Sequence, residues 1–172
     1  GLFGPKDTTT QAAFEYYTKF NKEPVGTAKT IKIEKPELID PINLDALLQK
    51  MLKNASEIKG KDLFIVSHGN KDGLVMQLFA KQTKKYYANT VSLNALMKYS
   101  AASIAKSSGF AQADIERLIK NMKAIQALQI KRLEFRGCTI GSSIPALKTL
   151  RQFFNADSVG ALKAKSNFGW LT

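Results

Sequence analysis

The chain has 172 residues, 44% of them hydrophobic and 23% charged, with a formal net charge of +12, and these proportions are typical of one globular domain. A chain of this length buries roughly 70% of the surface that it exposes when unfolded, so it can hold a core without cross-links. Its single cysteine excludes an internal disulfide, and the lack of an apolar run of about 18 residues excludes a membrane-spanning helix.

The first part of the chain predicts an accessory element followed by a folded domain. Residues 1–28 carry aromatic residues between positions 14 and 20, and we expect them to form an N-terminal arm or accessory element. Residues 29–172 are expected to form the main domain. The opening has no Met and no basic-then-apolar leader, so we expect the chain to be a trimmed piece of a longer polypeptide.

Hydrophobic periodicity predicts alternating strands and helices over the main domain. Strands are expected at 30–33, 63–66, 131–136 and 157–162, and helices at 44–52, 92–105, 115–125 and 144–154. The last of these helices is expected to begin at Ser143 as its capping residue, with Pro145 in its first turn. The apolar run 74–79 predicts either a hairpin strand or an extension of the sheet.

This order of elements predicts the fold class. Strands that alternate with helices of ten or more residues are typical of a mostly parallel sheet with helices on its faces. We therefore expect an α/β fold, a three-layer α/β/α sandwich. Residues 131–136 alternate charged and apolar side chains, which suits a buried central strand only where Glu134 pairs with Arg132 or Arg136.

Two reactive residues stand where an apolar run gives way to glycine. His68, the only histidine, follows Leu63–Val66, and Cys138, the only cysteine, follows Leu133–Arg136. A base that titrates near neutral pH and an ionisable thiol are the two groups that a thiol nucleophile mechanism needs. Because the carboxyl ends of parallel strands meet at one edge of a sheet, we expect both residues to face a shared crevice.

The backbone near these two residues is expected to assist them. The helix that begins at Ser143 points the positive end of its dipole toward Cys138, which favours the thiolate form of that residue. Gly69 has no side chain to obstruct its backbone N–H, so this group can approach a developing oxyanion.

These segments resemble the caspase-like cysteine peptidases, which include caspases, metacaspases, legumain, gingipains and separase. The resemblance is carried by a strand ending in Ser67-His68-Gly69, a later strand ending in Arg136-Gly137-Cys138, and the intervening Val91–Leu96. It covers about residues 30–162 as a pattern of elements, and only about a dozen positions as motif.

The resemblance implies a His/Cys dyad that hydrolyses peptide bonds through an acyl-enzyme. Cys138 would attack the peptide carbonyl, His68 would protonate the leaving amine, and the backbone N–H groups of Gly69 and Cys138 would hold the oxyanion. Caspases carry Gln-Ala before the nucleophile and Arg-Gly after it, whereas here Arg136-Gly137 precede it. The family's substrate specificity is therefore not transferred to this chain.

Two further residues near the dyad each have two interpretations. Asp72 either orients His68 or binds substrate, or it serves as a turn residue within Asn70–Gly73, which is the role that its neighbours favour. Arg136 either receives a carboxylate of the substrate through its planar guanidinium or pairs with Glu134.

Other chemistries have weaker support in the sequence. There is no Gly-x-Ser-x-Gly elbow of a serine hydrolase and no glycine-rich phosphate loop after the first strand. One His and one Cys are too few ligands to support a metal site. We therefore expect no cofactor and no metal, and a peptide or protein as the substrate.

The positive charge leaves a second class of function open. The lysines are spread along the chain, and only the stretch 81–87 brings cations close to aromatic residues, so nucleic-acid binding is not expected. The alternative to an enzyme is a non-catalytic caspase-like interaction domain that docks an acidic partner through its basic surface.

Overall fold

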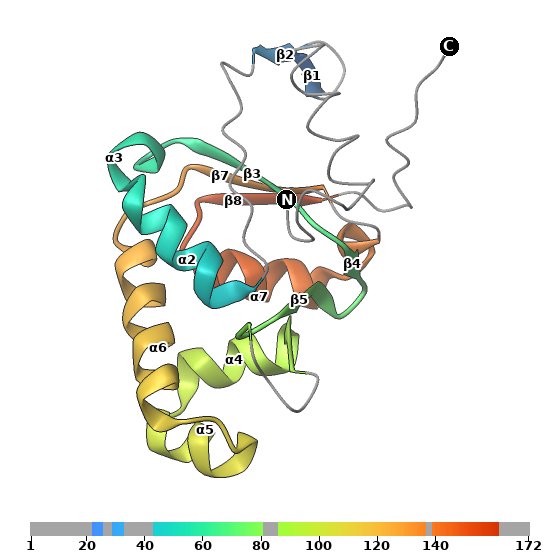
Figure 1. The fold of residues 1–172 in the computed structure, drawn as a ribbon. Helices are drawn as coiled ribbons and strands as arrows, with labels where there is room; N and C mark the ends of the chain where they lie inside the picture. The colour runs from blue at the N-terminus through green and yellow to red at the C-terminus, as the bar shows by residue number, and fades with distance from the viewer. Residues whose placement is uncertain (1–21, 26–28, 33–42, 81–85, 137–138, 162–172) are drawn as a thin grey trace.

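The computed structural model describes residues 22–25, 29–32, 43–80, 86–136 and 139–161, which form a mixed α/β structure (Figure 1). The strands are β1 (Lys22–Val25), β2 (Lys29–Lys32), β3 (Asp62–Val66), β4 (Gly69–Asn70), β5 (Gly73–Gln77), β6 (Tyr87–Asn89), β7 (Arg132–Arg136) and β8 (Ser158–Ala161). The helices are α2 (Leu44–Lys53), α3 (Ala55–Ile58), α4 (Thr90–Lys98), α5 (Ala101–Ser108), α6 (Gln112–Gln126), α7 (Ile144–Phe154) and the 3-10 turn η1 (Ile140–Ser142).

Three strands form a parallel sheet in the order β3-β7-β8. Its strands are separated in the chain by helices, as the alternating pattern of the sequence predicted, so the α/β class and the parallel pairing are confirmed. β1 and β2 form a separate antiparallel pair that joins the end of the expected arm to the start of the expected domain.

One face of the parallel sheet carries the hydrophobic core. Ile65 of β3 pairs with Phe135 of β7, which is fully buried and lies with its ring centroid 6.2 Å from that of Phe154 in α7. Helices α2 and α7 lie on one side of this sheet (Figure 1). Their buried apolar side chains supply the stabilising contact with the sheet, whereas the second helical layer of the predicted sandwich stays a prediction.

The opposite face of the sheet carries the charges that the sequence placed on β7. Glu134 is buried and accepts a hydrogen bond from Nη2 of Arg132 at 2.9 Å, which confirms one of the two expected pairings. Its neighbour on β8 is Gly160, where any side chain would collide with the Glu134 carboxyl group. A glycine in this strand therefore leaves the space that the carboxylate fills.

A second, antiparallel sheet has the order β4-β5-β6 and extends from the end of β3. The run 74–79 thus forms a hairpin strand rather than an extension of the parallel sheet. Gly73 starts β5 with φ of 136°, and a Cβ there would lie 3.0 Å from the Cα of Asn89, so the close approach of β6 requires glycine.

The helix expected over 92–105 is wrong in its boundaries, because the structure divides it into α4 and α5. Tyr99 is extended, and the Ser100 side chain accepts a hydrogen bond from the N–H of Ser103 to begin α5. α4 begins earlier than expected, because Asn89 caps it. The Asn89 side chain accepts a hydrogen bond from the N–H of Ser92, and the Ser92 hydroxyl accepts one from the N–H of Asn89.

An ion pair joins α2 to α6. Asp45, in the first turn of α2, accepts from Nη2 of Arg117 at 2.9 Å, and Asp114 lies 2.8 Å from the other terminal nitrogen of the same guanidinium. The hydrogen bond to Asp45 raises the pKa of Arg117 above its ordinary value, so the guanidinium stays charged throughout the physiological range. None of the helices in the described part has the length and apolarity needed to cross a membrane.

Candidate functional site at the carboxyl ends of β3 and β7

Strands β3 and β7 are direct neighbours in the parallel sheet, and their register aligns Val66 with Arg136. His68 follows Val66 by two residues, and Cys138 follows Arg136 by two residues. The two residues are therefore at equal distances along the chain from a pair of aligned strand ends. Gly137, Cys138 and the side chain of Arg136 lie outside the described residues.

The backbone at His68 is held by two hydrogen bonds to its carbonyl oxygen. The hydroxyl of the buried Ser67 donates at 2.8 Å, and the N–H of Val75 donates at 2.9 Å. His68 is half-buried, and the two hydrogen bonds to its carbonyl oxygen hold its backbone against the hairpin.

Gly69 lies in the hairpin so that its N–H points away from β5. The register pairs Gly69 with Leu74, while the adjacent pair joins the carbonyl of His68 to the N–H of Val75. Antiparallel pairs alternate between hydrogen-bonded and non-bonded positions, so Gly69 occupies a non-bonded position. Because β4 is at the edge of its sheet, the N–H of Gly69 is directed outward from the hairpin.

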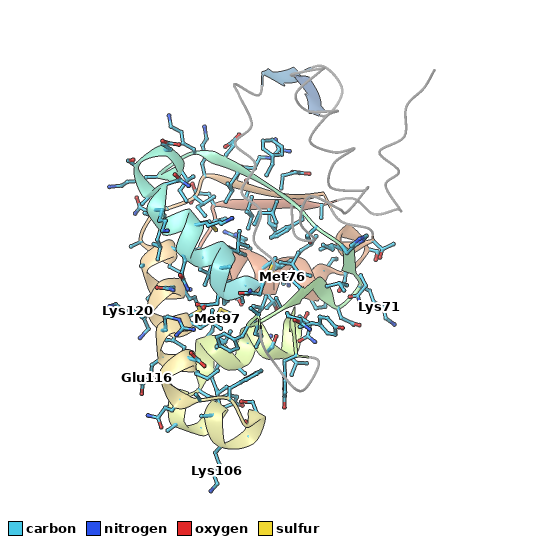
Figure 2. The ribbon with its side chains drawn as sticks, in the orientation of Figure 1. Lys71, Met76, Met97, Lys106, Glu116 and Lys120 are labelled. Carbon is cyan, nitrogen blue, oxygen red and sulfur yellow. The ribbon has the colours of Figure 1, made fainter. Side chains whose placement is uncertain are left out.

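Asp72 serves as a turn residue in the structure. Its N–H donates to Oδ1 of Asn70 at 2.8 Å, which closes an Asx turn, and its carbonyl oxygen accepts from the N–H and the hydroxyl of Thr90. Its carboxylate is exposed at the same loop as Lys71, which projects outward near β4 (Figure 2). The turn interpretation is thus the one that has observed contacts.

The chain after Cys138 forms a tight turn into α7. Thr139 has φ of 57°, and its carbonyl oxygen accepts from the N–H of Ser142 at 3.0 Å and from the hydroxyl of Ser142 at 2.6 Å. Ser143 then caps α7 by accepting from the N–H of Ala146 at 3.3 Å, with Pro145 in the first turn, as predicted. The N-terminal end of an eleven-residue helix therefore follows the turn that begins beside Cys138.

The left-handed backbone of Thr139 and the hydrogen bonds of Thr90 to Asp72 were not predicted from the sequence. A β-branched residue in the left-handed region costs about 1–3 kcal/mol and gives no local signal in the sequence, because glycine or asparagine is the usual choice there. Thr90 could have been found, because the spacing Asn89-x-x-Ser92 is that of a capping box and places Thr90 at the helix start.

Lys71 and Asp72 are both exposed in the turn that follows β4. Within the described ranges, no group of three or more His, Cys, Asp or Glu side chains is placed to hold a metal ion. Comparison of the chain with protein-family models, with curated proteins and with solved structures finds no match.

Proposed function

We propose that this protein is a caspase-like cysteine peptidase in which Cys138 is the nucleophile and His68 is the general acid and base. The observation that carries the proposal is the register of β3 and β7, which aligns Val66 with Arg136 and leaves both candidate residues two positions beyond the aligned ends. The loops that follow two neighbouring parallel strands begin at the same edge of the sheet, and this is the edge at which α/β proteins bind ligands.

The proposed reaction has two steps. The thiolate of Cys138 attacks the scissile carbonyl, a C–S bond forms, and the C–N bond breaks as protonated His68 gives its proton to the leaving amine. Neutral His68 then takes a proton from water, whose oxygen attacks the thioester. The C–S bond breaks, the carboxylic acid leaves, and the proton on His68 regenerates the starting ion pair with Cys138.

Backbone groups on this edge supply the other part of the mechanism. The N–H groups of Gly69 and Cys138 are the proposed donors to the tetrahedral oxyanion, and the non-bonded position of Gly69 in the β4-β5 pair, with its N–H directed outward, supports the first of these roles. The helix α7, whose N-terminus follows the Thr139 turn, favours the negative charge of the thiolate. Arg136 is proposed to receive an anionic group of the substrate.

The family's fold is part of the same proposal. In a caspase-like domain the parallel sheet is covered by helices on both faces, and a helix follows the histidine loop. The order β3, His68, the β4-β5-β6 hairpin and α4 is the described part that supports this assignment. His68 and Cys138 are 70 residues apart, whereas roughly 50 residues are typical of caspases. The segment between them contains three helices, α4, α5 and α6, in place of one.

The test is the reactivity of the thiol. Because Cys138 is the only cysteine, iodoacetamide labelling followed by mass spectrometry reports on this residue alone. We expect labelling at pH 7 to be at least about tenfold faster in the folded chain than in the same chain in denaturant, because the thiolate fraction is higher. His68→Ala should remove this difference.

Peptide cleavage completes the test. The unmodified chain should cleave an unstructured protein substrate such as casein, and Cys138→Ala and His68→Ala should not, while His68→Ala keeps the same thermal unfolding midpoint within a few degrees. Slow labelling in the folded chain, together with no cleavage by the unmodified chain, would instead favour the non-catalytic domain that docks an acidic partner.

A further inference from the structure

Ser67 is a buried polar residue between β3 and β4 to which the proposed reaction gives no role. It is 8% exposed and follows Val66, the last residue of β3, in the segment that leads directly into β4 (Figure 1). An alanine at this position would avoid the cost of burying a hydroxyl group. Buried hydroxyl groups take a hydrogen-bond partner, so the partner of Ser67 indicates what its hydroxyl does.

The hydroxyl of Ser67 holds the carbonyl group of the next residue. Its Oγ donates to the carbonyl oxygen of His68 at 2.8 Å, and the N–H of Val75 donates to the same oxygen at 2.9 Å. One donor belongs to β5 and the other precedes β4. A carbonyl oxygen has two lone pairs, so these two donors use its full accepting capacity and restrict the rotation of the group.

The orientation of this carbonyl also sets the orientation of the N–H of Gly69, because both belong to one peptide group. A peptide group is planar and trans, so its C=O and N–H point in opposite directions. The bond from Val75 directs the C=O of His68 toward β5, and the N–H of Gly69 therefore points away from β5. Hydrogen bonds to a carbonyl polarise the whole amide, which makes its N–H a stronger donor.

We propose that Ser67 is a positioning residue whose hydroxyl fixes the peptide group between His68 and Gly69 and so aims the N–H of Gly69 at the oxyanion of the tetrahedral intermediate. This inference rests on the proposed function, in which Gly69 is one of the oxyanion donors. A donor that is already oriented needs no reorganisation when the charge develops. The oxyanion is absent from the bound substrate, so the effect of Ser67 falls on kcat and not on KM.

Two reactions of the same thiol separate this role from a merely structural one. Peptide cleavage passes through an oxyanion, whereas alkylation of Cys138 by iodoacetamide forms a C–S bond, releases iodide and passes through none. We expect Ser67→Ala to lower kcat for peptide cleavage about tenfold and to leave both KM and the alkylation rate within twofold of the unmodified chain. An equal loss in both reactions, or an unchanged kcat, would overturn the proposal and leave the peptidase function standing.

Ser108→Ala is the matched control for the loss of a buried hydroxyl. Ser108 is 9% exposed, and its hydroxyl donates to the carbonyl oxygen of Ile104 at 2.7 Å within α5. This substitution removes the same kind of bond and should leave kcat within twofold. Ser67→Thr retains the hydroxyl and should keep kcat within about threefold. A loss of kcat in Ser108→Ala as large as that in Ser67→Ala would contradict the proposed role.

The orientation of the Gly69 N–H can be measured without any catalytic activity. Relaxation of the ¹⁵N nucleus gives the order parameter of this bond, which is about 0.85 in rigid backbone and below about 0.6 in flexible backbone. We expect the rigid value in the unmodified chain and in Ser108→Ala, and a clearly lower value in Ser67→Ala. An unchanged order parameter in Ser67→Ala would overturn the proposal even in a chain that cleaves peptides.

The same measurement distinguishes failure of this proposal from failure of the catalytic one. If the unmodified chain cleaves nothing, the peptidase function is refuted by that result alone. A lower order parameter at Gly69 in Ser67→Ala would then still support Ser67 as the residue that fixes this N–H.

Discussion

Replacing Gly160 of β8 with alanine should break the ion pair that lies on the charged face of the parallel sheet. A Cβ at position 160 would collide with Oε2 of Glu134 and would lie 2.8 Å from its Cδ, closer than real Cβ atoms approach other atoms. Glu134 is 7% exposed and is held at 2.9 Å by Arg132. The carboxylate must therefore move for the alanine to fit.

The size of the effect follows from the surroundings of Glu134. On an open surface the end of a glutamate side chain would turn away at little cost. Here the displacement breaks a charge-assisted hydrogen bond of a buried group, which costs about 1.5–3 kcal/mol. With a denaturant slope of about 2 kcal/mol/M in urea, the midpoint of unfolding should fall by about 1 M.

A double-mutant cycle with Glu134→Ala identifies the cause. In that background the carboxylate is gone, so Gly160→Ala should cost less than about 0.5 kcal/mol, because alanine suits a strand better than glycine does. Urea unfolding followed by circular dichroism of the four chains gives the coupling energy. An equal loss of stability in both backgrounds would refute the steric argument.

Three other substitutions test how the loops around the candidate site are held. Ser143→Ala removes the cap of α7 and should lower the free energy of unfolding by about 1 kcal/mol, measured by calorimetry; an unchanged value would mean that the cap contributes nothing. Gly73→Ala should cost about 2 kcal/mol or more in urea unfolding, because it adds strain at φ of 136° and meets the backbone of Asn89. Thr90→Val removes the hydroxyl bond to Asp72 and should speed hydrogen exchange at residues 70–73 while changing global stability by less than about 1 kcal/mol; unaltered exchange would contradict this role.

Periodicity in the sequence predicted the long elements because burial follows the same periodicity in the folded chain. The stripe of Ile115, Leu118, Met122 and Ile125 predicted a helix, and in α6 all four side chains are buried. Ser143 and Pro145 predicted the start of α7 because capping depends on residues that are close in sequence. These predictions needed no knowledge of long-range contacts.

The break between α4 and α5 shows where periodicity fails. Apolar residues from Leu93 to Ala105 continue with helical spacing, but Tyr99 adopts an extended conformation and Ser100 caps a new helix. A hydrophobic stripe indicates which side chains face the core, but it does not indicate where the chain changes direction between two short helices. Serine is common enough inside helices that its capping role at position 100 becomes visible only with the backbone.

Periodicity could not predict how the segments that carry His68 and Cys138 are aligned, because this alignment depends on the register of β7 against β3. Leu133 and Phe135 are fully buried, whereas Arg132 and Glu134 face the other side of the sheet. A slip of β7 by one residue would move the charged pair into the core and the apolar pair out of it, so the core fixes the register.

The same slip would move the end of β7 by about 3.3 Å relative to β3, roughly the length of a hydrogen bond. The packing of Leu133 and Phe135 against the helices therefore determines where the segment after Arg136 begins relative to His68. Local sequence nominates His68 and Cys138 as candidates, but only the core can align the strands that precede them. The proposed dyad therefore predicts that core substitutions in β7 that leave the chain folded alter thiol reactivity as strongly as changes at His68 itself.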